Sequence, residues 1–83
     1  MSLEDLLSNA RQKVVGTKQT VKALEKGSVN RVFIARDAEE RVVQPILALC
    51  EEKKIEPYYI DTMTELGKMC GIKVKAAAAA ITE

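Results

Sequence analysis

The chain has 83 residues, of which 30% are charged, 47% hydrophobic and 4% aromatic, and its formal net charge at pH 7 is +1. A chain of this length has room for one domain, expected over residues 1–83, which buries about two thirds of its unfolded surface. We therefore expect no large enclosed active site. Because there is no histidine and the two cysteines form neither a CxxC pair nor a zinc cluster, we expect no metal site and no cofactor.

The first predicted elements are a helix and a short strand. Apolar residues at helical spacing predict a helix from Ser2 to about Arg11, with Ser2 as its N-cap. The Lys13–Val15 segment that follows is too short to be more than an edge strand. The N-terminal segment is acidic and has no apolar run long enough for a signal peptide or a membrane span, so the chain is expected to stay in the cytosol.

The second predicted helix runs from Thr17 to Lys26. Thr17 is its expected N-cap, and Gly27 supplies the left-handed residue that ends it. Lys18, Lys22 and Lys26 are spaced by four residues and therefore share the outer face of the helix.

The start of this helix, from Gly16 to Lys22, is the most informative segment of the chain. A tight turn opens a helix whose first turns carry Lys18, Gln19 and Lys22 but no acidic residue. Free backbone N–H groups and the positive end of the helix dipole attract anions, and the Gln19 amide can donate and accept hydrogen bonds at once. This combination suits nucleic acid better than a metal or a small acid. The alternative is an ordinary surface helix with solvated lysines.

The middle of the chain predicts a buried strand and a helix. Arg31 to Ala35 contains three large apolar residues in a row, which is typical of a strand covered by helices on both faces. Residues 39–54 have a helical period, but Pro45 has no backbone N–H and pushes the residue before it out of the helical region. We therefore expect a short helical turn first and then a main helix that starts near Pro45.

The last third of the chain alternates strand, helix and strand. Residues 56–61 form the next predicted strand, and Thr62 with Glu65 three residues later is a capping box that opens a short helix ending at Gly71. The Ala76–Ala80 run has the best helix propensity in the chain. The regular alternation of elements nevertheless favours a central strand there, because small side chains let helices pack closely on both faces of a sheet.

Two interpretations are open for Gly71-Ile72-Lys73-Val74-Lys75. In the first, Ile72 and Val74 begin an amphipathic strand and lie in the core, while the two lysines face solvent. In the second, the segment is a loop that offers apolar side chains between two cations, which suits an unstacked base and its phosphate.

Charge is distributed unevenly along the chain. Asn9 to Arg31 has a net charge of +5 and Gly67 to Lys75 a net charge of +3, whereas all other residues sum to −7. The total of +1 therefore conceals two basic segments in an otherwise acidic chain, and these basic segments support nucleic-acid binding. The three aromatic residues are too few for a platform of several stacked rings, so any RNA recognition must use other means. The paired acids at 39–40 and 51–52 are interpreted as solvated surface and not as catalytic pairs.

Four motifs run through the chain: Gly-Thr-Lys-Gln-Thr-Val-Lys-Ala-Leu at 16–24, Ala-Arg-Asp-Ala at 35–38, Leu-Cys-Glu-Glu-Lys at 49–53 and Leu-Gly-Lys-Met-Cys-Gly-Ile at 66–72. In order and spacing they resemble the L7Ae ribosomal-protein family, most of all its small bacterial members of the YbxF type. The resemblance covers nearly the whole chain and implies an α/β fold, a three-layer α/β/α sandwich with a four-stranded mixed sheet.

The resemblance also implies a non-enzymatic function, the binding of kink-turn RNA, in which tandem sheared G·A pairs and a protruding nucleotide bend two stems sharply. The helix start would enter the groove beside the G·A pairs, and the apolar loop would pack on the protruding nucleotide. The implied partner is structured RNA, with ribosomal RNA as one candidate, rather than DNA or a membrane, and the chain is expected to be a monomer. The RNA-binding residues that the resemblance implies are Gly16, Thr17, Lys18, Gln19, Lys22, Gly71, Ile72, Lys73, Val74 and Lys75. Arg36, in the motif at 35–38, is predicted as a further RNA-binding residue.

This chain departs from the family pattern at Lys18-Gln19, where archaeal and eukaryotic members usually carry Asn-Glu. A glutamate accepts from guanine N–H groups with full charge, whereas Gln19 accepts through a neutral amide. We therefore expect weaker discrimination of G·A pairs and more reliance on phosphate contacts. Two other classes stay open. One is a protein-interaction module whose basic segments meet an acidic partner, and the other is a thiol-dependent enzyme that uses Cys50 or Cys70, both expected to be reduced and partly buried.

Overall fold

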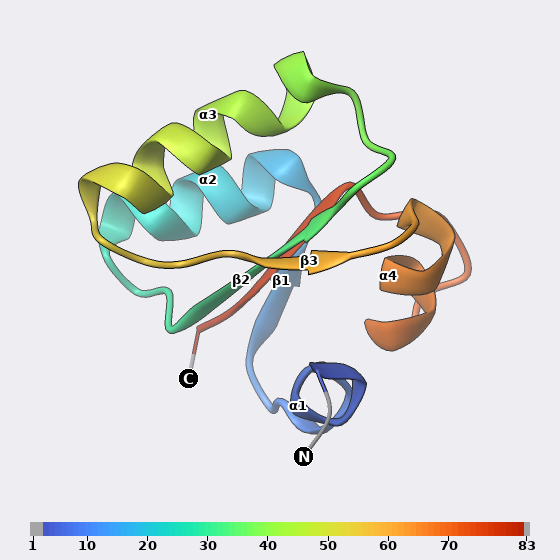
Figure 1. The fold of residues 1–83 in the computed structure, drawn as a ribbon. Helices are drawn as coiled ribbons and strands as arrows, with labels where there is room; N and C mark the ends of the chain where they lie inside the picture. Colours follow the sequence, from blue (N-terminus) through green and yellow to red (C-terminus); the bar gives the residue numbers. More distant parts are fainter. Residues whose placement is uncertain (1–2, 83) are drawn as a thin grey trace.

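The helices of the chain cover both faces of a four-stranded mixed sheet in a computed structural model that describes residues 3–82 (Figure 1). Helices α2 and α3 lie on one face, and α1 and α4 lie on the other, so the predicted three-layer α/β/α sandwich is confirmed. The elements in chain order are α1 (Leu3–Asn9), β1 (Lys13–Val15), α2 (Thr17–Lys26), β2 (Arg31–Ala35), α3 (Glu40–Glu52), β3 (Tyr58–Ile60), α4 (Met63–Met69) and β4 (Ala78–Ile81). The predicted N-cap Ser2 lies outside the described residues.

The strand order is β1-β4-β2-β3. Strand β4 is antiparallel to both of its neighbours, and Ala79 pairs with Val15 on one side and with Phe33 on the other. Strands β2 and β3 are parallel, with Ile34 opposite Tyr59. The carboxyl ends of β1, β2 and β3 and the amino end of β4 therefore lie together, and we call this end of the sheet the Ala78 end.

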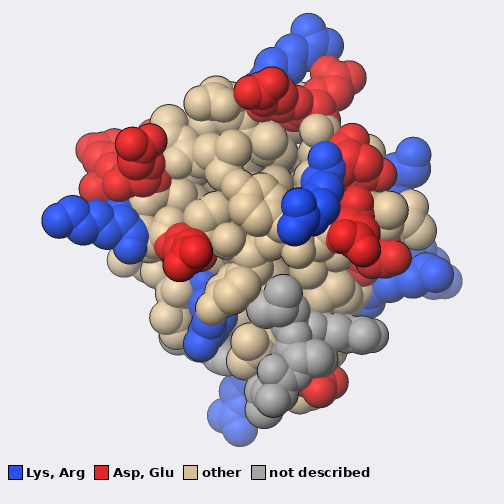
Figure 2. All heavy atoms as spheres, viewed as in Figure 1, with Lys and Arg blue, Asp and Glu red and all other residues tan. Residues whose placement is uncertain are grey.

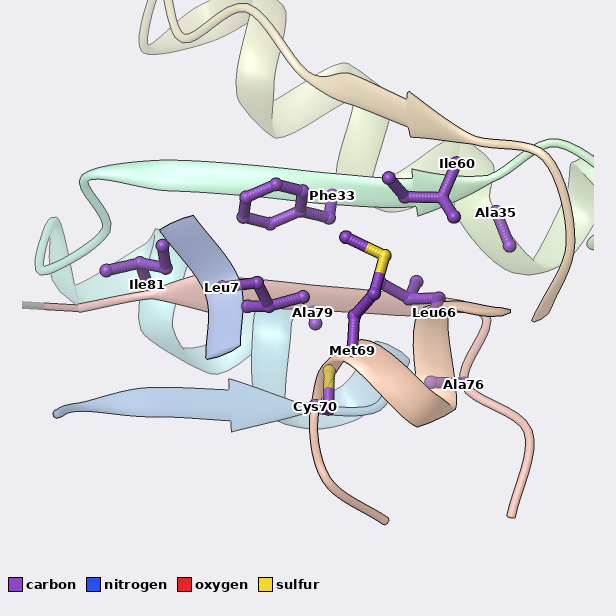
Figure 3. Packing of buried hydrophobic residues seen from close by; sticks show 10 residues of the cluster. All are labelled: Leu7, Phe33, Ala35, Ile60, Leu66, Met69, Cys70, Ala76, Ala79 and Ile81. Atoms are coloured by element: carbon purple, nitrogen blue, oxygen red, sulfur yellow. The ribbon is translucent and has the colours of Figure 1, made fainter. Parts of the chain in front are cut away.

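The alanines of β4 explain how two helical layers pack on so small a sheet. Ala78, Ala79 and Ala80 are completely buried. Ala79 belongs to the core under α1 and α4, whereas Ala78 and Ala80 belong to the core under α2 and α3. The prediction of a central strand at this run is thus confirmed, because side chains on both of its faces must be small. Figure 3 shows the first of these cores, formed by Leu7, Phe33, Ala35, Ile60, Leu66, Met69, Cys70, Ala76, Ala79 and Ile81.

The interruption predicted at Pro45 is wrong, because α3 is one continuous helix that contains this proline. Val43, Ile46 and Cys50 are buried along one side of α3, before and after the proline, and pack in the same core. Pro45 lies on the exposed side of the helix, where solvent can bond the carbonyl group that the proline leaves without a helical donor. Burial of the apolar side therefore outweighs a proline cost of about 3 kcal/mol.

The other local predictions are mostly confirmed. Gly27 ends α2 in the left-handed conformation, and the hydroxyl oxygen of Thr62 accepts a hydrogen bond from the Glu65 backbone N–H at 3.0 Å. Strand β1 is an edge strand, and β3 is shorter than the segment predicted for it. No helix within residues 3–82 is long and apolar enough to cross a membrane.

Both cysteines are free, and they are more deeply buried than predicted. Burial raises the pKa of the Cys50 and Cys70 thiols, and nearby Lys13 offsets part of this rise at Cys70. Both thiols are therefore protonated at neutral pH, and a buried protonated thiol is a poor nucleophile.

Candidate nucleic-acid interface

The turn between β1 and α2 consists of Gly16 alone. Its φ of 107° and ψ of 155° lie in a region that side chains disfavour. Gly16 occupies the N-cap position, so the prediction that Thr17 caps the helix is wrong; Thr17 is the first helical residue. The physical reason is that a one-residue turn from strand to helix needs a positive φ, and the glycine that supplies it takes the cap position.

The start of α2 is open to an anion. The first backbone N–H groups of any helix have no partner within that helix. Here the N-cap residue, Gly16, makes no side-chain hydrogen bond to them, and no acidic residue lies in the first turn. Thr20, which the sequence analysis did not single out, holds this turn in place: its buried hydroxyl donates to the Gly16 carbonyl oxygen at 2.8 Å. A threonine four residues after a turn glycine is the signal that could have identified it.

The polar side chains of this helix start are exposed but point to two sides of α2. Gln19 lines an open hollow of about 360 Å³ on the β1 side, together with Lys22 and Lys26. Lys18 lines another of about 430 Å³ on the α3 side, and Lys22 borders both. A ligand that spans the helix start can therefore meet Gln19 on one side and Lys18 on the other, with Lys22 between them.

The segment after α4 is a loop, so the interpretation of Ile72 and Val74 as the start of a core strand is wrong for Val74. Gly71, which follows the C-cap residue Cys70, takes a φ of 78°, and Val74 is 70% exposed. Ile72 is half-buried and packs against the core under α1 and α4. One apolar side chain thus anchors the loop, while Val74 stands in solvent between the exposed Lys73 and Lys75.

Gly67 of α4 has no side chain and therefore lets this loop approach the helix closely, a role that was not predicted from the sequence. A Cβ on Gly67 would overlap the Val74 carbonyl oxygen and lie 3.2 Å from the Val74 carbonyl carbon. The available signal was a glycine inside a predicted helix, which usually marks a close backbone approach. An open hollow of about 940 Å³ lies against the loop, and it also includes Thr64 and Lys68 of α4.

Backbone hydrogen bonds bring the predicted segments to the Ala78 end of the sheet. The Gly16 N–H donates to the Ala78 carbonyl oxygen at 2.8 Å, and the Ala35 N–H donates to that of Ala77 at 2.9 Å. The start of α2, the end of the loop and the end of β2 are therefore neighbours. Figure 1 shows the loop after α4 at the right edge of the molecule and the start of α2 at the right-hand end of that helix. Basic side chains protrude at the right edge in Figure 2, with acidic ones among them.

Arg36, also at the Ala78 end, has its own partners on the β3 side. Its backbone N–H donates to the Ile60 carbonyl oxygen at 2.7 Å. The guanidinium carbon lies 5.3 Å from the centre of the Tyr59 ring, and Nε lies 3.7 Å from Asp61 Oδ1. The structure thus brings Arg36 to the same end of the sheet as the other predicted residues but engages its side chain with β3.

Comparison with known proteins agrees with the four sequence motifs. A model of the ribosomal protein L7Ae/L30e/S12e/Gadd45 family matches residues 1–83. RNA-binding protein TTE2299 from Caldanaerobacter subterraneus subsp. tengcongensis is 59% identical over 69 residues, which cover 83% of this chain and 84% of that protein. RNA-binding protein YbxF from Geobacillus stearothermophilus is 41% identical over 81 residues, 98% of each chain. The structure is also similar to the Giardia lamblia 15.5kD RNA binding protein, with a TM-score of 0.90 and 25% identity over 98% of this chain and 71% of that one.

Proposed function

The chain belongs to the ribosomal protein L7Ae/L30e/S12e/Gadd45 family, and we propose that it is an RNA-binding protein that recognises a kink-turn and stabilises its bent form. The observation that carries the proposal is the meeting of two segments at the Ala78 end of the sheet. The helix start and the Gly71–Lys75 loop are far apart in sequence, yet the Gly16 N–H donates a hydrogen bond to the carbonyl oxygen of Ala78, three residues after the loop. Open helix N–H groups and an exposed apolar side chain beside lysines are complementary to phosphate and to an unstacked base.

Each part of this surface has a distinct role in the proposal. Gln19 meets the polar edges of the G·A pairs, and Lys18 and Lys22 meet phosphates on the two sides of the helix start. Val74 packs on the protruding nucleotide, while Lys73 and Lys75 meet its phosphates. Gly16, Thr17, Gly71 and Ile72 shape the two segments by their backbone conformation and packing.

The mechanism is a shift of population between RNA conformations. Free kink-turn RNA exchanges between extended and bent forms, and a protein that contacts only the bent form favours it in proportion to its differential affinity. The protein has no catalytic step in this proposal. It acts in the cytoplasm as a monomer on structured RNA, with ribosomal RNA as one candidate target.

The proposal is tested with a kink-turn duplex that carries fluorophores on its two stems and with a control in which the G·A pairs are replaced. Protein addition is expected to bring the stems of the intact RNA together and to leave the control extended at the same salt concentration. Equal affinity for both RNAs would refute kink-turn recognition. Failure to bind either RNA, with binding to an acidic protein retained, would favour the interaction module instead.

A further inference from the structure

We propose that Arg36 and Tyr59 together form a stacking site for one unpaired nucleobase of the bound RNA, next to the nucleotide that packs on Val74. This inference rests on the proposed function and extends its surface from the loop to β3. Tyr59 is not among the residues that the family resemblance implies, and the composition excludes only a platform of several rings. A single ring paired with an arginine is compatible with the chain.

The position of the pair places it beside the proposed RNA surface. The Ala35 N–H donates a hydrogen bond to the Ala77 carbonyl oxygen, and the Arg36 N–H donates one to the Ile60 carbonyl oxygen. The end of β2 thus lies between the end of the loop and the end of β3, and Tyr59 is the middle residue of β3. An RNA strand that leaves the loop along this end of the sheet meets Arg36 next.

The geometry of the pair suits a flat ligand. The Arg36 guanidinium carbon lies 5.3 Å from the centre of the Tyr59 ring, within the range of a cation–π contact. The Tyr59 residue is 43% exposed and the Arg36 side chain is 63% exposed. A cation held over an aromatic ring keeps its own planar surface open, and bases stack on both arginine planes and aromatic rings.

Two neighbouring carboxylates favour a base over a phosphate at this site. Asp61 Oδ1 lies 3.7 Å from Arg36 Nε, and Asp37 is the next residue in the chain, where its Oδ1 accepts a hydrogen bond from the Met63 N–H at 2.8 Å. One positive and two negative charges leave this corner acidic, unlike the helix start. A phosphate would meet repulsion here, whereas the neutral face of a base would not.

The contrast with Tyr58 supports the assignment. The Tyr58 ring stacks on Phe33, with ring centres 5.7 Å apart, and its hydroxyl accepts a hydrogen bond from Arg31 Nη1 at 2.6 Å. Both the ring and the hydroxyl of Tyr58 therefore have partners within the protein. Within residues 3–82, the ring contact of Tyr59 is with Arg36, so this ring and its arginine are available to a ligand.

The test uses the whole protein and kink-turn RNA with 2-aminopurine at each unpaired position in turn, because stacking quenches this fluorophore. Tyr59→Leu removes the ring, Tyr59→Phe retains it, and Arg36→Lys retains the charge but removes the planar group. We expect quenching at one unpaired position beside the protruding nucleotide. Tyr59→Leu and Arg36→Lys are expected to abolish that quenching and weaken binding about tenfold, whereas Tyr59→Phe preserves both.

The salt dependence of binding separates the base from a phosphate. Arg36→Ala removes the charge. If Arg36 stacks on a base, Arg36→Ala weakens binding while the slope of log affinity against log salt stays unchanged, whereas a slope lowered by about one unit would show a phosphate contact and overturn the inference. Normal binding and quenching in Tyr59→Leu and Arg36→Lys proteins with native circular dichroism would overturn the inference. The proposed function would still stand if these proteins preferred RNA with intact G·A pairs. Loss of that preference in the unmodified protein would overturn the proposed function, and the inference with it.

Discussion

Replacing Gly67 by alanine tests whether the close approach of α4 and the loop positions Val74. The added Cβ would overlap the Val74 carbonyl oxygen, so the loop backbone must move by about 1 Å or more to restore ordinary contact. Such overpacking costs about 1–3 kcal/mol, while alanine returns about 1 kcal/mol of helix propensity. We expect a net loss of about 1 kcal/mol in the free energy of unfolding.

Gly67→Ala should weaken RNA binding more than it weakens the fold. Val74 moves with the loop, and loss of about 1.4 kcal/mol of its packing on a nucleotide is a tenfold loss of affinity. The assays are urea denaturation and titration with kink-turn RNA under conditions where the variant is fully folded. Gln44→Ala is the control, since Gln44 is exposed on α3 and belongs to neither segment of the proposed RNA surface. A Gly67→Ala protein that is more stable by about 1 kcal/mol and binds RNA normally would refute the reasoning, because alanine would then act through helix propensity alone.

Three further predictions concern the RNA surface. Lys18→Ala and Lys22→Ala should each weaken binding and lower the salt slope by about one unit, and an unchanged slope in both would remove these lysines from the phosphate contacts. Gln19→Glu should strengthen the preference for intact over disrupted G·A pairs by about 1 kcal/mol of binding free energy at fixed salt, since a charged acceptor strengthens the hydrogen bond. An unchanged preference in a folded variant would show that Gln19 does not meet the G·A edges. Val74→Ala should weaken binding to RNA with the protruding nucleotide and leave stability within about 0.5 kcal/mol of the parent, whereas Ile72→Ala should lower stability as well. Equal effects of the two substitutions on denaturation would contradict their different burial.

Several elements followed from short-range signals in the sequence. The helical period of α2 and α4, the stop at Gly27, the Thr62 cap and the apolar run of β2 all depend on residues within one or two helical turns or a single strand, and these predictions are confirmed. The alternation of helices and strands was sufficient to predict a strand at Ala78–Ile81 against its helix propensity, because the central position of a two-sided sheet requires small side chains.

Where local sequence signals compete with packing, only the tertiary structure determines the local conformation and the burial of each side chain. Pro45 stays inside α3 because the apolar side of the helix is buried along its whole length, and this gain arises only when the sheet is in place. Ile72 and Val74 have the same pattern in sequence, but the contact of the loop with α4 at Gly67 sends one toward the core and leaves the other exposed. Arg36, Tyr59 and Asp61 meet because β2 and β3 pair in parallel, so the sites that a ligand would contact depend on strand pairing that no local pattern specifies.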